Sequence, residues 1–160
     1  VGIVVDPFLA GTTTSATVTQ ARMTYAVKID THSGSFEIDE KITQNVTGAV
    51  GRVVEWDEAN KILYYLQERF PNYGVDTDGN QIAFTGANTI TGGTSGASAS
   101  PDITDVSLEV LGNGGSIQWA NGYALPELES DSGKIIYIEN RRPISRASDQ
   151  TEDIKIVVEF

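Results

Sequence analysis

The sequence predicts a mainly β protein, in which an antiparallel sheet or sandwich domain carries an inserted, small β-barrel-like module. Short runs of alternating apolar and polar residues recur along the chain, and clusters of Gly, Asn, Asp and Ser separate them. One stretch in the middle also repeats, as a duplicated supersecondary unit would. With 39% hydrophobic residues among 160, the chain can form the core of one ordinary domain or of two small ones.

The N-terminal part is expected to contain two strands. The first is the apolar run "GIVVDP", which ends in Asp6-Pro7, a turn signal. Small polar residues follow over 9–18 and predict a loop. The run 21–29 alternates apolar and polar residues like a half-buried strand. Because the chain begins directly on a strand pattern without Met, we expect it to come from the C-terminal part of a larger protein.

In the repeat, "FEIDEKITQNVTGAVG" (36–51) aligns with "FTGANTITGGTSGASA" (84–99) at one constant offset. The agreeing positions are Phe36 and Phe84, Ile42-Thr43 and Ile90-Thr91, and Gly48-Ala49 and Gly96-Ala97. A repeated structural unit is the preferred interpretation. Chance is the alternative, because Gly, Thr and Ala are common residues.

The segment between the two copies allows a helix or a hairpin. "DEANKILYYLQERF" has helical propensity. The hairpin consists of "RVVEW", a turn from Asp57 to Asn60, and "KILYYLQ". We favour the hairpin, because β-branched and aromatic residues are typical of strands and Asp and Asn are typical of turns.

The remainder predicts further strands joined by loops. Residues 92–101 have the composition of a flexible connector, and 102–119 predict two short strands around "GNGG". The run "KIIYIEN" is a strand. In the final "EDIKIVVEF" apolar residues alternate with polar ones, as in a strand with one face in a core.

Composition argues against several classes of function. A net charge of −11 repels phosphate backbones, so no nucleic acid partner is expected. No apolar run approaches the ~20 residues of a membrane-spanning helix, so no membrane partner is expected either. The chain has no Cys and a single His, His32, which excludes thiolate chemistry and a metal site with two His ligands.

Local motifs are better explained as turns than as sites, and we expect no catalytic residue, metal or cofactor. His32 and Ser33 are sequence neighbours in one turn, which is the wrong geometry for a nucleophile and its base. "DTDGN" has its Gly at the wrong place for a calcium loop. "GNGG" precedes a strand pattern, not the helix that a phosphate-binding loop opens. A catalytic pair of carboxylates is not excluded, but nothing singles one out.

One charged cluster, the C-terminal loop, is the candidate site. Its charges are mixed in sign, so its net field is weak. Bidentate Arg–carboxylate pairs would order the loop within the chain or hold a neighbouring chain, and composition does not decide between the two. The candidate residues are Glu139, Asn140, Arg141, Arg142, Pro143, Arg146, Asp149, Gln150, Thr151 and Glu152.

The segment 132–160, "SGKIIYIENRRPISRASDQTEDIKIVVEF", resembles the extreme C-terminus of a baseplate wedge protein, gene product eight of T-even-type contractile-tailed phages. "VGIVVDP" (1–7) is loosely similar to a strand that precedes this region in the family. The matching positions are Ser132-Gly133, Ile136-Tyr137, Glu139-Asn140-Arg141, Pro143-Ile144, Ala147, Asp149-Gln150-Thr151-Glu152, Ile154 and Phe160.

The resemblance implies a structural virion protein of the tail baseplate, not an enzyme. Other baseplate wedge proteins would be its partners, the full-length protein would be a homodimer, and assembly would take place in the host cytoplasm. Residues 1–29 plus 104–160 would form the wedge protein's C-terminal β domain, with 30–103 as the inserted β module. The sequence pattern of that module is similar to that of β modules in structural proteins of T4-like phages of cyanobacteria.

Two other functions are weighed beside this one. The inserted module could be a virion binding module that recognises a host surface glycan or another tail protein. A shallow groove lined by Trp56, Tyr64, Tyr65 and Tyr73 would favour it. A virion-borne hydrolase would need two carboxylates facing each other in a cleft.

Overall fold

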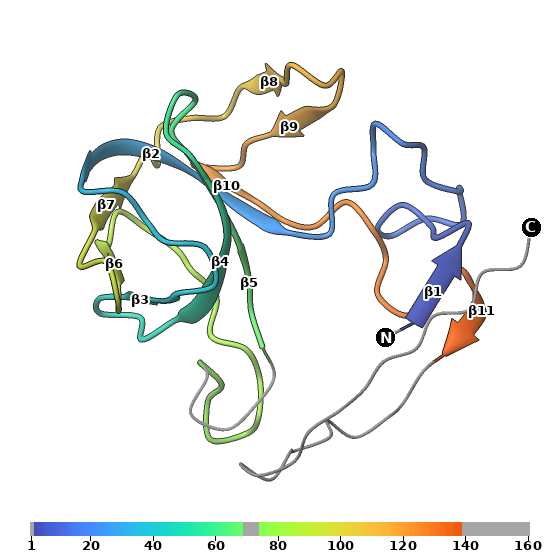
Figure 1. The fold of residues 1–160 in the computed structure, drawn as a ribbon, viewed down its shortest axis with the longest axis horizontal. Helices are drawn as coiled ribbons and strands as arrows, with labels where there is room; N and C mark the ends of the chain where they lie inside the picture. Colours follow the sequence, from blue (N-terminus) through green and yellow to red (C-terminus); the bar gives the residue numbers. More distant parts are fainter. Residues whose placement is uncertain (1, 69–73, 139–160) are drawn as a thin grey trace, which may run out of the picture.

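The computed structural model describes residues 2–68 and 74–138 and is built there from strands and loops (Figure 1). Every strand pair within these residues is antiparallel, and the mainly β prediction is confirmed. The described part has no helix that could span a membrane.

Six of the described strands close into a small barrel, seen at the left of Figure 1. They are β2 (Tyr25–Ser33), β3 (Lys41–Gln44), β4 (Val50–Asp57), β5 (Ile62–Leu66), β6 (Ile90–Gly92) and β7 (Ser98–Pro101). Their order is β2-β5-β4-β3-β6-β7, and β7 pairs back with β2. The short β10 (Tyr123–Ala124) pairs with the first half of β2.

Alternation along the strands divides the apolar side chains between two cores. Val27 and Leu63 point into the barrel, where they join the main cluster, while Ala26 and Ile62 face outward. The hairpin of β8 (Leu108–Val110) and β9 (Ser116–Gln118) covers that outer face. The main core contains Val27, Ile29, Phe36, Ile42, Ala49, Val53, Leu63, Tyr65, Phe84, Ile90, Ala97 and Ala99.

The β4–β5 hairpin prediction is confirmed, and the helical alternative is wrong. The two strands pair from Asp57↔Ile62 to Arg52↔Leu66, with a bulge between Val53 and Glu55. The Asp57 carboxylate accepts a hydrogen bond from the Asn60 backbone N–H at 3.0 Å and so closes the turn. The alternation of buried and outward residues outweighs the helical propensity of this segment.

The two copies of the predicted internal repeat have equivalent turns. In the first copy the Gln44 N–H donates to Ala49 O at 2.8 Å; in the second, Gly92 N–H donates to Ala97 O at the same distance. The two copies meet where β3 pairs with β6. Thr43 lies opposite Thr91, so the copies are related by an approximate two-fold axis there.

The residues 92–101, expected to be a flexible connector, are instead ordered, and that prediction is wrong. Residues 98–101 are strand β7, which completes the barrel. The preceding turn is held by the buried Glu40 carboxylate, which accepts hydrogen bonds from the Thr94 and Ser95 N–H groups at 3.0 Å. Composition alone does not show such a partner, because Glu40 is far away in the sequence.

A second part of the molecule lies to the right of the barrel in Figure 1. Its outer end is a two-stranded ribbon of β1 (Gly2–Val5) and β11 (Lys134–Ile138). Between the ribbon and the barrel, the segments 6–24 and 125–133 run side by side. We call this part, residues 2–24 together with 125–138, the arm.

Candidate assembly surface

The predicted site, Glu139 to Glu152, lies wholly outside the described residues. The predicted strand over 152–160 lies outside them too. Whether Arg141, Arg142 and Arg146 pair with carboxylates therefore stays a prediction. The described structure reaches the edge of this segment, because β11 ends at Ile138.

The ribbon next to it exposes many apolar side chains. In β11 Tyr137 pairs with Ile3 and Ile135 pairs with Val4, so the register shifts there and Ile136 is skipped. All four residues 135–138 of the strand are apolar. The exposed fractions are 60% for Ile135, 58% for Ile136, 49% for Tyr137, 65% for Ile138, 49% for Ile3 and 45% for Val4. An apolar concentration of this kind marks an interaction surface.

The base of the ribbon is fixed by Ser132 and Gly133, two positions of the family resemblance. The Ser132 hydroxyl accepts a hydrogen bond from the Phe8 N–H at 2.9 Å and donates to Glu129 O at 2.8 Å. Gly133 has φ +86°, and a Cβ there would lie 2.7 Å from Val4 Cγ1. A larger residue therefore does not fit where the two strands meet.

Arg22 and Glu127 join the two segments of the arm where they reach the barrel. The Glu127 carboxylate accepts from the Arg22 N–H at 3.0 Å, and the Glu127 N–H donates to Arg22 O at 2.8 Å. The guanidinium donates to Thr24 O and, at 2.8 Å, to Leu125 O. Burial lowers the pKa of Arg22, while Glu127 and Tyr64 act in the opposite direction.

The β8–β9 hairpin presents a second group of exposed apolar residues. Val106, Leu108 and Val110 are 64%, 60% and 74% exposed. The opposite side of the hairpin is anchored to the barrel: Glu109 pairs with Lys28 at 2.8 Å and accepts from the Trp119 indole N–H at 2.9 Å. The hairpin is therefore held in place while one of its faces stays open.

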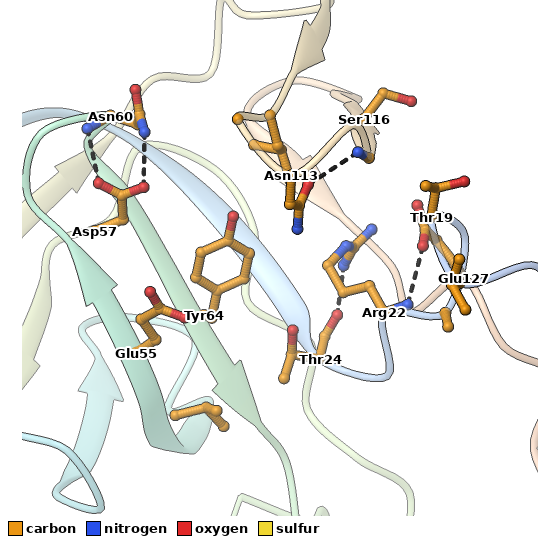
Figure 2. A pocket seen from close by; sticks show the side chains of 16 residues that line it. Thr19, Arg22, Thr24, Glu55, Asp57, Asn60, Tyr64, Asn113, Ser116 and Glu127 are labelled. Atoms are coloured by element: carbon orange, nitrogen blue, oxygen red, sulfur yellow. Dashed lines mark hydrogen bonds between the residues drawn. The ribbon is translucent and has the colours of Figure 1, made fainter.

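A cavity of about 450 Å³ lies between the barrel, the tip of this hairpin and the start of the arm (Figure 2). Tyr64 stands in the middle, with Glu55 and Asp57 on the barrel side and Arg22 on the arm side. Burial, with Asp57 and Glu55, raises the pKa of Tyr64 to about 12, so its hydroxyl stays protonated at neutral pH.

The aromatic groove that would favour a binding module does not form from the described residues. Tyr64 lines the cavity, but its neighbour Tyr65 is 2% exposed and lies in the barrel core. Trp56 packs edge-on against Phe36, with ring centroids 5.6 Å apart, and against His32. Tyr73 lies outside the described residues. Strand alternation separates Tyr64 from Tyr65, because neighbours in a strand point to opposite faces.

Two of the sequence motifs set aside as turns are turns in the structure, whereas the turn expected at His32 and Ser33 is wrong, because both residues lie at the end of β2 and pair with β7. The Asp76 carboxylate accepts from the Asp78 and Asn80 N–H groups at 3.0 and 2.8 Å. The Asn113 side chain accepts from the Gly115 N–H at 2.9 Å. Among residues 2–68 and 74–138 no group of three His, Cys, Asp or Glu side chains is placed to hold a metal ion.

Sequence reasoning singled out the charged C-terminal loop and missed the apolar surface beside it. The four successive apolar residues 135–138 were available as a signal, since such a run is typical of a strand buried on both faces. Arg22 was missed as well. Its role depends on the packing of 22 against 125–127, which no local pattern shows.

The family described as "Bacteriophage T4, Gp8" matches residues 108–160, about a third of the chain. The match begins at β8 and includes β9, β10 and β11. No curated protein and no solved structure matches the chain. The match supports a relation between the C-terminal part of the chain and the T4 baseplate wedge protein, and it gives no support to a cyanobacterial origin.

Proposed function

We propose that the chain is a structural component of a phage tail baseplate wedge, and that it acts through contacts with other wedge proteins. The observation that carries this proposal is the family match over residues 108–160. The exposed apolar side chains of β8 and β11 lie within the matched residues, and those of β1 lie beside them. Assembly in the host cytoplasm and a homodimer of the full-length protein belong to the same proposal.

The arm is the proposed contact surface, and the barrel is a module inserted into it. The chain enters the barrel at Tyr25 and leaves it at Ala124, and these ends are close, since Ala124 lies opposite Ala26 in the β2–β10 pair. Domain insertion needs this proximity. The earlier division at 29 and 104 stays a prediction; β2 runs across its first boundary, so we propose 24/25 and 124/125 as the joints.

The charged loop Glu139–Glu152 would brace this surface. It follows β11 directly in the sequence. Apolar contact supplies most of the energy of an interface, while charged pairs set partner and register. No catalytic role is proposed for the loop or for any other residue.

Cross-linking of purified tails tests the function. Tails of the phage that encodes this chain are treated with an amine-reactive cross-linker and analysed by mass spectrometry. We expect peptides of the chain in the tails, with links from Lys134 in the ribbon to other tail proteins. Lys61, in the β4–β5 turn of the barrel, is the internal comparison and should link less often. Absence of the chain from purified tails would contradict the proposal.

The second candidate is a binding module, and the cavity beside Tyr64 favours it. A tyrosine ring can stack on a sugar, and the carboxylates around it can accept hydrogen bonds from the sugar hydroxyls. A glycan array with Tyr64→Ala as the control variant tests this. Binding that disappears in the variant would support recognition of a glycan; equal signals from both proteins would argue against it.

A further inference from the structure

One wall of the cavity beside Tyr64 is a face of the β4–β5 hairpin. Glu55 and Tyr64 lie directly opposite each other in the strand pair, so their side chains stand on the same face of the sheet. Asp57 follows two residues after Glu55 and lies on that face as well. One aromatic ring and two carboxylates therefore line one side of a cavity of about 450 Å³, a size typical of small-molecule sites (Figure 2).

The two carboxylates of this wall differ in their partners. Asp57 accepts hydrogen bonds from the Asn60 side chain at 2.8 Å and from the Asn60 backbone N–H at 3.0 Å. These bonds lower the pKa of Asp57, so it is ionised at neutral pH. Lys28 acts in the same direction but is itself paired with Glu109 at 2.8 Å. Glu55 is exposed and accepts no hydrogen bond within the described part of the chain, so there its oxygens are available to a ligand.

The charges around the cavity do not balance. Among the lining residues that the structure describes, the acids are Glu55, Asp57 and Glu127, and the base is Arg22. Arg22 lies on the arm side, where its backbone N–H donates to the Glu127 carboxylate at 3.0 Å and its guanidinium donates to two backbone carbonyls. An excess of negative charge therefore remains on the barrel side, and it attracts a cation and repels an anion.

Tyr64 narrows the choice of cation. Its ring is half-buried, and burial raises the pKa of its hydroxyl to about 12, so the ring carries no charge of its own at neutral pH. A tyrosine ring packs on the apolar face of a sugar, and it attracts an ammonium group placed over it. A cationic sugar would satisfy both the ring and the carboxylates. A neutral sugar leaves Glu55 without a charged partner, and an acidic sugar meets repulsion.

We propose that this cavity recognises an amino sugar, whose ring stacks on Tyr64 while its ammonium group faces Glu55 and Asp57. The inference rests on the second candidate function, recognition of a glycan, and names the class of sugar. It does not depend on the baseplate function.

Three sugars that differ in charge test this with the full chain: the methyl glycosides of glucosamine, glucose and glucuronic acid. At about pH 6 the amine is protonated and the carboxylates are ionised. Binding is followed by NMR titration of amides that line the cavity, such as those of Leu111 and Ser116, with Ile42 in the barrel core as the internal control. We expect the glucosaminide to bind about threefold to tenfold more tightly than the glucoside, and the glucuronide to bind most weakly.

The outcomes separate the class of sugar from glycan recognition itself. Equal affinities for the glucosaminide and the glucoside would overturn the amino-sugar assignment and leave glycan recognition standing. No change at the cavity with any of the three sugars would overturn the assignment and would also count against the second candidate function.

Two variants with the same change in net charge locate the effect. Glu55→Gln removes a carboxylate from the cavity wall and should remove most of the difference between the glucosaminide and the glucoside. Glu58→Gln removes the same charge from the exposed β4–β5 turn, does not alter the cavity lining and should leave the difference in place. An equal loss in both variants would show a general effect of net charge and would contradict the assignment.

A last probe separates the sugar from its ammonium group. The methylamide of Nα-acetyl-lysine carries an ammonium group without a sugar ring, so we expect it to bind more weakly than the glucosaminide. If the two bound equally tightly, the cavity would recognise the ammonium group alone, and the assignment to an amino sugar would be wrong.

Discussion

Glu40 and Gln44 show how single residues hold the barrel together. Both are buried, at 5% and 0% exposure, and both use Oε1 to accept a backbone N–H and a hydroxyl at equivalent places of the repeat. Gln44 Oε1 accepts from Thr85 N–H and Thr47; Glu40 Oε1 accepts from Glu37 N–H and Ser95. The equivalent hydrogen bonds are therefore accepted by Gln44 at one place and by Glu40 at the other.

In the second copy Gly92 stands at the place of Gln44, and this explains why Glu40 can enter. A Cβ on Gly92 would lie 2.6 Å from Glu40 Oε1 and 2.5 Å from Ser95 Oγ. The glycine therefore leaves the space that the carboxylate fills. The sequence predicted the repeat, but it did not predict this exchange, because the two oxygens come from positions that do not align.

Acid sensitivity follows from Glu40. Burial alone would raise its pKa, but hydrogen bonds from Ser95, Glu37 and Thr94 outweigh burial, so the pKa lies below the ordinary value. Its contribution to stability is therefore complete above the unfolded pKa, about 4.3, and is lost as the pH falls through the folded pKa. We expect Glu40→Gln to cost about 1–3 kcal/mol at neutral pH and to flatten the loss of stability below about pH 4.3.

Urea unfolding as a function of pH measures both effects. Glu37→Gln is the matched control, since its side chain is exposed and only its backbone N–H bonds to Glu40. This control should lose stability at low pH as the parent chain does. If Glu40→Gln also lost stability at low pH as steeply as the parent chain, other carboxylates would be the main cause of the acid sensitivity.

The close approach at Gly133 predicts a local defect in the arm. Gly133→Ala would suffer both the positive φ and a Cβ contact with Val4 and Val5, whereas Gly11→Ala has φ +71° and nothing within 4 Å. Both variants bear backbone strain of about 1–2 kcal/mol. We expect only Gly133→Ala to accelerate amide exchange throughout β1 and β11; equal acceleration by Gly11→Ala would refute the steric account.

At the scale of elements, the periodicity of apolar residues predicted those strands and turns that depend on nearby residues in the sequence. The β4–β5 hairpin and the repeated turns follow from alternation and from Asp, Asn and Gly, and both were predicted. Strand β7 was mistaken for a connector because its residues are small and because one of its partners, β2, is far away in the sequence. Non-local pairing of this kind leaves little trace in composition.

The approximate two-fold relation makes a quantitative prediction. Ile42 and Ile90 are equivalent, both fully buried, and lie in the same core. Ile42→Val and Ile90→Val should each lower the free energy of unfolding by about 0.5–1.5 kcal/mol, by similar amounts. Ile38→Val, at a position 75% exposed, is the control and should have almost no effect. A large difference between the two core variants would show that the repeats are not energetically equivalent.

At the scale of the whole molecule, the barrel and the arm divide the chain differently from the sequence expectation. A fragment of residues 25–124 retains all of β2 and β10, together with both hydrophobic clusters. A fragment of 30–103 lacks Ala26, Val27 and Ile29, all at most 1% exposed.

We therefore expect the 25–124 fragment to unfold cooperatively and the 30–103 fragment to remain unfolded. Near-ultraviolet circular dichroism and thermal scans of the two fragments provide the measurement. Cooperative folding of 30–103 alone would restore the division at 29 and 104.

The central claim is that the arm is the surface through which this chain joins a tail assembly. A cryo-EM map of the intact baseplate of the encoding phage tests it most directly. The account predicts that Ile135, Ile136 and Ile138 are covered by other parts of the baseplate, whereas the barrel projects away from these contacts. A map in which the chain is present, the ribbon faces solvent and the barrel makes the contacts would contradict it.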